Sequence, residues 1–243
     1  MAVVIKGSGS IEGSTGLEMG ANGTTEIRGQ VNVAVGSSVA GVSTATQFAP
    51  TDNQLSNRNM VINGDFSISQ RGESGVNMST NAYLLDRFKA MSSTDGEGAV
   101  TRDSDTPTQA ESNGSKFPYS LKVDCTTADT SLASSQYVII THRIEGKNVA
   151  HLAFGTAGTR YATLSFWVKA PAGTYCVSFR NSAYNRTYLA EYTVSSADTW
   201  GKHIITIPID TSGTWLTTNG MGLDIQWALG TGSSFQGAAG SWA

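Results

Sequence analysis

The sequence predicts an all-β protein, folded as a sandwich or a barrel. From Met60 onward, apolar and polar side chains alternate with a period of two in several short runs. Stretches rich in Gly, Pro, Asn and Asp separate these runs and act as turn signals. No segment has a convincing helical period, and the one short candidate, residues 81–91, fits a strand equally well. Alternating runs between closely spaced turns are typical of antiparallel sheets.

Composition excludes two classes of partner. The chain has 243 residues with 16 basic and 19 acidic side chains, giving a formal net charge of -3. This charge balance provides neither a basic footprint for nucleic acid nor a polybasic face for a membrane. No apolar run approaches the roughly 20 residues that span a bilayer, and the short run at residues 2–5 does not resemble a signal peptide. We therefore expect no nucleic-acid partner and no membrane insertion.

The first part of the chain differs in character from the rest. Its short apolar segments repeatedly end in glycine, and no aromatic residue occurs before Phe48. Such units offer too few apolar side chains to bury a core alone, but several intertwined chains would bury one. We expect residues 1–47 to form an oligomerisation stalk of a homotrimer, with a flexible arm as the alternative. Residues 48–59, which are rich in loop formers, are expected to be a linker.

The third region, residues 60–243, carries the strand signals in order. The alternating runs lie at residues 119–125, 161–170, 174–180, 202–210 and 221–229, and the run at residues 134–144 is a further strand candidate that is apolar on both sides, as in a central strand. In the run at residues 161–170, Leu164, Phe166 and Val168 share one face and predict a half-buried strand. Pro208 cannot donate a ladder hydrogen bond, so its strand is expected at a sheet edge or at a bulge.

Cysteine usage and catalytic motifs give little support for reactive chemistry. Two cysteines, Cys125 and Cys176, do not form a disulfide framework, so we expect two buried free thiols, with a single bridge as the alternative. The histidines are scattered, and no zinc motif, phosphate loop or nucleophile elbow occurs. A pair of glycosidase carboxylates cannot be located from the sequence alone. We expect that the protein is not an enzyme.

The opening of the third region carries a recognisable pattern. Asn63-Gly64-Asp65-Phe66 leads through Gln70-Arg71-Gly72 to Tyr83 and Asp86-Arg87-Phe88. This order resembles the start of a domain common in bacteriophage tail-fibre and related virion proteins, although Ser69 stands where that pattern usually has Trp. The runs "FPYSLKVDC", "RYATLSFWVKAPAGTYCVSF" and "SADTWGKHIITIPIDTSGTW" resemble strands of a carbohydrate-binding-module-like fold.

The resemblance covers residues 60–243 and implies a galactose-binding-like jelly-roll β-sandwich. The closing strand usual in this group has no counterpart, so we expect the domain to lack it. The resemblance also implies a virion structural protein, assembled in the host cytoplasm and released by lysis. We expect a tail fibre that recognises a host-surface glycan, with residues 1–47 contacting other virion proteins. The alternatives are a capsid fibre or head decoration protein, and a carbohydrate-binding module of a secreted enzyme.

Candidate glycan contacts follow from sugar chemistry. Sugar rings dock their C–H faces on aromatic rings, while amides and charged side chains bond the hydroxyl groups. The residues that fit these roles are Trp167, Arg180, Asn181, Tyr184, Asn185, Tyr188 and Trp215. For Tyr188, packing on the sheet is the alternative interpretation.

The opening motif also suggests local roles. Asn63 and Gly64 permit the positive φ of a tight bend. Asp65 is expected to cap a turn through backbone N–H groups. The alternative is that Asp65 ligates a structural calcium, as the resemblance implies, and this would need several oxygen ligands from separate segments. We expect no other cofactor.

Overall fold

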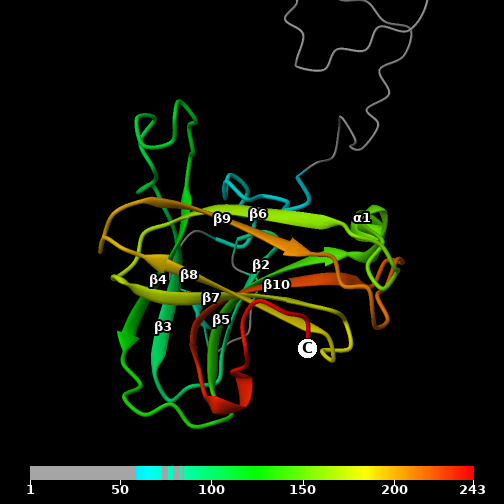
Figure 1. The fold of residues 1–243 in the computed structure, drawn as a ribbon. Helices are drawn as coiled ribbons and strands as arrows, with labels where there is room; N and C mark the ends of the chain where they lie inside the picture. Colours follow the sequence, from blue (N-terminus) through cyan, green and yellow to red (C-terminus); the bar gives the residue numbers. More distant parts are fainter. Residues whose placement is uncertain (1–58, 73–75, 79–82, 84) are drawn as a thin grey trace, which may run out of the picture. The chain divides into compact units, whose positions relative to one another are not determined.

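The computed structural model describes residues 59–72, 76–78, 83 and 85–243, and these belong to one compact unit, Gln54–Ala243. Antiparallel strands form three sheets in this unit (Figure 1). The predicted all-β sandwich is confirmed, and the barrel alternative is wrong. The stalk at residues 1–47, and the linker apart from Asn59, lie outside the described residues and stay predictions.

The sheets can be followed in Figure 1. The five-stranded sheet has the order β2 (Phe88–Ser92), β5 (Tyr137–Glu145), β10 (Met221–Thr231), β7 (Gly173–Arg180) and β8 (Thr187–Val194). The three-stranded sheet joins β1 (Val76–Asn77), β3 (Glu97–Asp103) and β4 (Ser120–Thr127). The remaining pair is β6 (Tyr161–Val168) with β9 (Gly201–Pro208). Short helical turns are α1 (Gly146–Val149), η2 (Ala150–Leu152) and η3 (Ser233–Phe235).

The main core lies between the five-stranded sheet and the β6–β9 pair. Leu164 of β6 and Ile207 of β9 are buried against Val177 and Phe179 of β7, as their alternation predicts. Burying each such side chain stabilises the fold by roughly 1.5–3 kcal/mol. A second cluster joins the three-stranded sheet to β2 and β5, and it consists of Met78, Phe88, Ala90, Val100 and Ile140.

Two local expectations from the sequence are resolved by these packing arrangements. In the ambiguous segment 81–91, the residues from Phe88 onward form strand β2, because Phe88 and Ala90 enter the second cluster in alternation with half-buried neighbours. Pro208 ends β9, and among the described strands β9 pairs with β6 alone, so the predicted edge position is confirmed.

The last residues of the chain lie along the outer edge of β8. Trp242 pairs with Tyr188 in an isolated antiparallel β-bridge. Next to it, Thr187 and Ala243 exchange backbone hydrogen bonds of 3.0 and 2.9 Å. The indole Nε1 of Trp242 donates to the carbonyl oxygen of Pro208 at 2.7 Å. The C-terminal segment is therefore anchored to both β8 and β9.

Neither cysteine forms a disulfide, so the bridge alternative is wrong. The expectation that both thiols are buried is also wrong, because Cys125 is exposed and Cys176 is half-buried. Cys125 lies in the C-terminal half of β4, where consecutive side chains on both faces are exposed. Among the described residues, no helix has the length and apolar character needed to cross a membrane.

The long loop between β3 and β4, residues 104–119, is fastened to two other turns. The carboxylate of Asp105 accepts hydrogen bonds from Lys169 Nζ at 2.6 Å and from Trp200 Nε1 at 3.0 Å. The hydrogen bond from Lys169, followed by that from Trp200, lowers the pKa of Asp105. The rings of Phe117 and Trp167 lie 6.4 Å apart and add an aromatic contact.

Candidate functional site

The opening motif folds into a tight turn that reaches β2. Asn63 has φ 59 and uses its whole carboxamide. Its Oδ1 accepts the backbone N–H of Ile68 at 2.9 Å, and its Nδ2 donates to the carbonyl oxygens of Ile68 and Asp86, each at 2.9 Å. A short polar side chain that bonds locally suits this left-handed conformation. Asn63 therefore joins the first turn of the domain to the Asp86-Arg87 pair.

The Asp86-Arg87 pair makes contacts in two directions. Asp86 Oδ2 accepts the backbone N–H of Gln70 at 2.7 Å, and Arg71 Nη1 lies 3.7 Å from Asp86 Oδ1. Arg87 Nη2 instead donates to Glu145 Oε2 at 2.7 Å. The hydrogen bond from Arg87 lowers the pKa of Glu145 to about 2. The two residues are thus paired to other groups, and each is half-buried.

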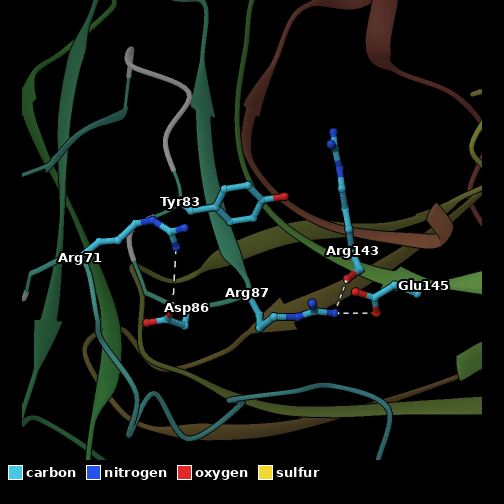
Figure 2. A pocket seen from close by; sticks show the side chains of 6 residues that line it. All are labelled: Arg71, Tyr83, Asp86, Arg87, Arg143 and Glu145. Atoms are coloured by element: carbon cyan, nitrogen blue, oxygen red, sulfur yellow. Dashed lines mark hydrogen bonds and ion pairs between the residues drawn. The ribbon is translucent and has the colours of Figure 1, made fainter. Parts of the chain in front are cut away.

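These side chains line a pocket with a volume of about 320 Å³. Its lining consists of Arg71, Tyr83, Asp86, Arg87, Arg143 and Glu145 (Figure 2). Tyr83 is 39% exposed, and the guanidinium carbon of Arg71 lies 5.8 Å from its ring centroid. Figure 2 shows the side chain of Arg143 extending away from the Arg87–Glu145 pair. Arg143 therefore connects this pocket to the neighbouring strands of the sheet.

A buried carboxylate lies on the face of the sheet to which Arg143 belongs. Strand register places Asp224 of β10 opposite both Arg143 of β5 and Arg180 of β7. Asp224 is fully buried and accepts hydrogen bonds from Thr141 Oγ1 and, at 2.8 Å, from Gln226 Nε2. Burial raises the pKa of Asp224, while these hydrogen bonds and the two guanidinium groups oppose the rise.

Tyr184 lies over the two arginines. The guanidinium carbon of Arg180 is 4.4 Å from the Tyr184 ring centroid, which is a cation–π contact. Arg143 Nη2 donates to the Tyr184 hydroxyl at 3.2 Å. The ring remains 45% exposed, so it is held in place and still open to solvent. We call Arg143, Arg180, Tyr184 and Asp224 the arginine–tyrosine cluster.

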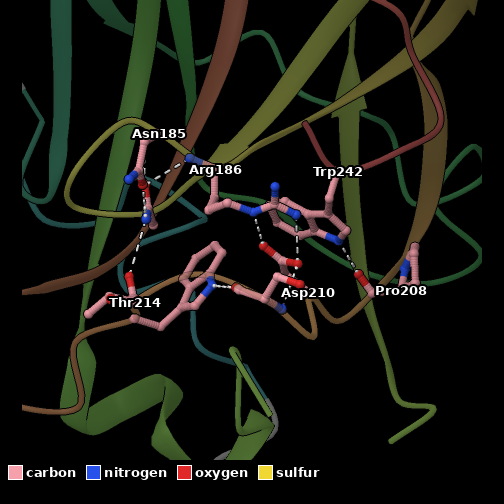
Figure 3. Close-up of polar contacts among 9 residues, drawn as sticks. Asn185, Arg186, Pro208, Asp210, Thr214 and Trp242 are labelled. Atoms are coloured by element: carbon pink, nitrogen blue, oxygen red, sulfur yellow. Dashed lines mark hydrogen bonds and ion pairs between the residues drawn. The ribbon is translucent and has the colours of Figure 1, made fainter. Parts of the chain in front are cut away.

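A buried amide, that of Asn181, holds the loop that carries Tyr184, and its partner residues Asn185, Arg186 and Thr214 are labelled in Figure 3. Asn181 is fully buried, and its Oδ1 accepts the backbone N–H groups of Asn185 and Arg186, each at 3.2 Å. Its Nδ2 donates to Asn185 Oδ1 at 2.7 Å and to the carbonyl oxygen of Thr214 at 3.1 Å. Both predicted asparagines thus have structural partners in this loop.

The other five residues predicted from the sequence fall into three places. Arg180 and Tyr184 lie together in the cluster. Tyr188 is buried in the main core, and Trp215 stacks on Phe154 with ring centroids 4.3 Å apart. Trp167 lies on the outer face of the β6–β9 pair, where it is opposite Lys202. The predicted set is therefore not a single surface, and the glycan contact of Arg180 and Tyr184 stays a prediction.

Sequence reasoning did not select several residues of the site, namely Arg71, Tyr83, Arg143, Glu145 and Asp224. A signal was present in β5, where Thr141, Arg143 and Glu145 occupy alternate positions and so share one face. Polar residues at alternate positions in an otherwise apolar strand indicate a face with a specific use. The partner strand β10 had the same signal, because Asp224 and Gln226 occupy alternate positions in its run.

Asp65 has the turn-capping contacts that its position predicts. Its Oδ1 accepts the backbone N–H of Ser67 at 3.3 Å and the Ser67 hydroxyl at 3.0 Å. Within the described residues, no group of three or more His, Cys, Asp or Glu side chains is placed to hold a metal ion. A calcium ligand role for Asp65 stays a prediction.

The sequence matches no protein-family model and no curated protein. Two solved structures share part of the fold. The enzymatically active domain of tailspike protein 4 from bacteriophage CBA120 has a TM-score of 0.36 at 13% identity, over 59% of this chain and 17% of that chain. An arabinose-bound α-L-arabinofuranosidase has a TM-score of 0.41 at 14% identity, over 75% of this chain and 24% of that chain. Both neighbours are β-rich, carbohydrate-related folds, and the likeness concerns the fold alone.

These neighbours require one correction. The expectation that the protein is not an enzyme is contradicted, because one neighbour is an enzymatically active tailspike domain and the other is an arabinofuranosidase. The prediction was based on missing sequence motifs, and carboxylates that act on sugars share no fixed spacing along a chain. This chain spans about a quarter or less of the length of either neighbour.

Proposed function

We propose that residues 60–243 form a glycan-recognition domain of a bacteriophage virion protein, with a tail fibre as its place in the particle. One observation carries the proposal: an exposed tyrosine is held by two arginines above a buried carboxylate, beside a pocket that contains a second exposed tyrosine. The resemblance of the opening motif and the strand runs to phage virion domains supports the assignment to a particle.

The arginine–tyrosine cluster has the groups that sugar binding needs. Arg180 covers part of the Tyr184 ring, and the exposed part offers an apolar surface to the C–H face of a sugar. The guanidinium groups on either side supply hydrogen-bond donors for hydroxyl oxygens. The loop is fixed by Asn181, so little conformational freedom is lost on binding.

A trimeric arrangement in the particle would strengthen weak sugar contacts. If residues 1–47 join three chains, three copies of the cluster contact one polysaccharide together. Linking weak sites in this way raises the overall affinity by about 10²–10⁴-fold without any new contact. In this proposal, the stalk also attaches the domain to other virion proteins.

The test is a binding measurement of the full chain with purified host-surface polysaccharide. We expect Tyr184→Ala to weaken binding by at least about tenfold, because a central aromatic contact is lost. Tyr161→Ala is the matched control, since Tyr161 is exposed on β6, in a different sheet, and should bind as the unaltered chain does. Release of new reducing ends in the same mixture would show hydrolysis in addition to binding. Equal affinities for all three proteins, or no binding at all, would contradict the proposal.

A further inference from the structure

We infer that the arginine–tyrosine cluster binds an acidic sugar, one that carries a carboxylate or a phosphate group. This inference rests on the proposed glycan-binding function and specifies its ligand class. The balance of charges in the pocket and in the cluster supports it. In the pocket, Arg71 pairs with Asp86 and Arg87 pairs with Glu145. In the cluster, Arg143 and Arg180 share a single carboxylate, that of Asp224.

Asp224 does not fully satisfy these two cations. Its oxygens already accept hydrogen bonds from Thr141 and Gln226, and Arg143 Nε remains 3.9 Å from Oδ2, beyond hydrogen-bond distance. The Nε atoms of Arg143 and Arg180 are both buried without a hydrogen-bond partner. Across pocket and cluster, four arginines face three carboxylates, which leaves one positive charge unmatched in a chain of net charge -3.

The arginines also keep free donors at the exposed tyrosine. Arg143 uses Nη2 for the Tyr184 hydroxyl, and Arg180 uses Nη1 for Gln226 Oε1 at 3.3 Å. The other terminal nitrogens, Arg143 Nη1 and Arg180 Nη2, donate no hydrogen bond within the described part of the chain. A guanidinium fork matches the geometry of a carboxylate or phosphate, and a charge-assisted pair is stronger than a bond to a neutral hydroxyl.

The arrangement therefore divides the ligand into two parts. The ring of Tyr184 contacts the apolar face of the sugar, and the guanidinium groups beside it contact the acidic group. Asp224 is buried beneath and acts as a positioning residue, because it orients the arginines without reaching the surface. A neutral sugar would use the ring but leave the extra charge unmatched.

The experiment compares two matched pairs of probes on the full chain. Oligogalacturonate is set against its methyl ester, and a phosphorylated pentamannose against unphosphorylated pentamannose. We expect the charged member of at least one pair to bind about tenfold tighter, as one charged hydrogen-bond pair implies. The pair that shows the difference identifies carboxylate or phosphate as the recognised group. The preference should shrink as salt is added, because the contact lies at the surface.

Variants link the preference to the cluster. Arg143→Gln and Arg180→Gln should reduce the ratio of charged to neutral affinity toward one, while Arg143→Lys, which keeps the charge, should retain part of it. Lys202→Gln is the control, since it removes an exposed positive charge on β9 and should leave the ratio unchanged. Urea midpoints of all variants show whether each one is folded.

The outcomes separate this inference from the function on which it rests. If neutral and charged probes bind equally, or if both Gln variants keep the full preference, the acidic-sugar inference is overturned. If none of the four probes binds but host polysaccharide does, this inference is likewise overturned and the glycan-binding function stands. If host polysaccharide also fails to bind, the proposed function itself fails.

Discussion

Arg186 holds the buried carboxylate of Asp210 with two parallel hydrogen bonds, Nε to Oδ2 at 2.7 Å and Nη2 to Oδ1 at 3.0 Å (Figure 3). The side chain of Asp210 is only 3% exposed and also accepts the backbone N–H of Ser212 at 3.0 Å. The pair connects the loop that carries Tyr184 to the segment after β9. The loop that carries the exposed tyrosine is therefore held by this ion pair.

Removing one of these charges should destabilise the domain strongly. In Arg186→Met, the buried carboxylate of Asp210 loses its partner, and we expect the free energy of unfolding to fall by about 3 kcal/mol. The double variant Arg186→Met with Asp210→Leu removes both charges and should recover much of that loss. Urea unfolding measures all three proteins, and a double variant no more stable than the single one would refute the explanation.

Tyr184 occupies a backbone conformation that disfavours a side chain. Its φ is 57, and such left-handed geometry costs a residue other than glycine about 1 kcal/mol. Tyr184→Gly should therefore be more stable than Tyr184→Ala by about 1 kcal/mol, although both lose the ring and with it the proposed glycan contact. Thermal or urea unfolding of this matched pair is the measurement. If the Ala variant is the more stable of the two, the tyrosine backbone is not strained.

Acid should destabilise the protein through His142. This side chain is fully buried against Phe88, with ring centroids 4.7 Å apart. Burial, reinforced by the positive charge of Arg87, lowers the pKa of His142 to about 4 from 6.5. The unfolded chain therefore takes up a proton at higher pH than the folded chain does. The contribution of neutral His142 to stability is fully present above about pH 6.5 and is lost as the pH falls toward 4. The free energy of unfolding should therefore fall by about 2.5 kcal/mol between pH 7 and 4.5.

His142→Phe should reduce this pH dependence, because no proton can be taken up at the site, and the part that remains is expected from His203, whose pKa is also lowered by burial. The measurement is the urea midpoint at half-unit steps between pH 4.5 and 7. The lower limit avoids the titration of Glu145, whose pKa is lowered to about 2 mainly by Arg87 and whose contribution is lost only below its unfolded pKa near 4.5. Parallel curves for both proteins would rule out His142 as the acid-sensitive group.

Trp242 should contribute more stability than a residue next to a chain end usually does. Its ring lies 5.4 Å from those of both Tyr188 and Trp215, and its indole donates to the carbonyl oxygen of Pro208. Because the side chain is half-buried, Trp242→Ala should lower the free energy of unfolding by about 2 kcal/mol. Ser241→Ala, at an exposed neighbouring position, is the control and should change the unfolding midpoint little.

Strands β4, β5, β6, β7, β9 and β10 were predictable because each has a strand signal in its own run, whereas β1, β3 and β8 were not among the predicted runs. The faces of β6 and β9 follow directly from residues two apart, as with Leu164 and Phe166. Segment 81–91 was ambiguous because only its last residues, from Phe88, form a strand, and they do so by pairing with β5, which lies far along the chain. The exposure of Cys125 was also not predictable, because it depends on whether another segment packs on β4. The run that contains Cys125 carries no information about this.

The site was less predictable because it is assembled across strands. Arg180 and Tyr184 stood out as polar and aromatic residues at the end of a strand. Asp224 could not be linked to β5 in advance, since its bonding partner Thr141 is 83 positions away. Aromatic residues such as Trp215 also gave no clue to their burial, because Phe154, on which Trp215 stacks, comes from a distant segment.

The fastening of the loop at residues 104–119 has a consequence for proteolytic lifetime. A protease needs an extended segment that is free of the body, and an exposed loop of this length is ordinarily an easy target. Here, Asp105 is tied to Lys169 and Trp200, and Phe117 contacts Trp167. Cleavage therefore has to wait for these ties to open together. With Asp105→Ala, subtilisin should cut within the loop faster than in the unaltered chain, so that this carboxylate lengthens the time for which the domain stays intact in the presence of a protease.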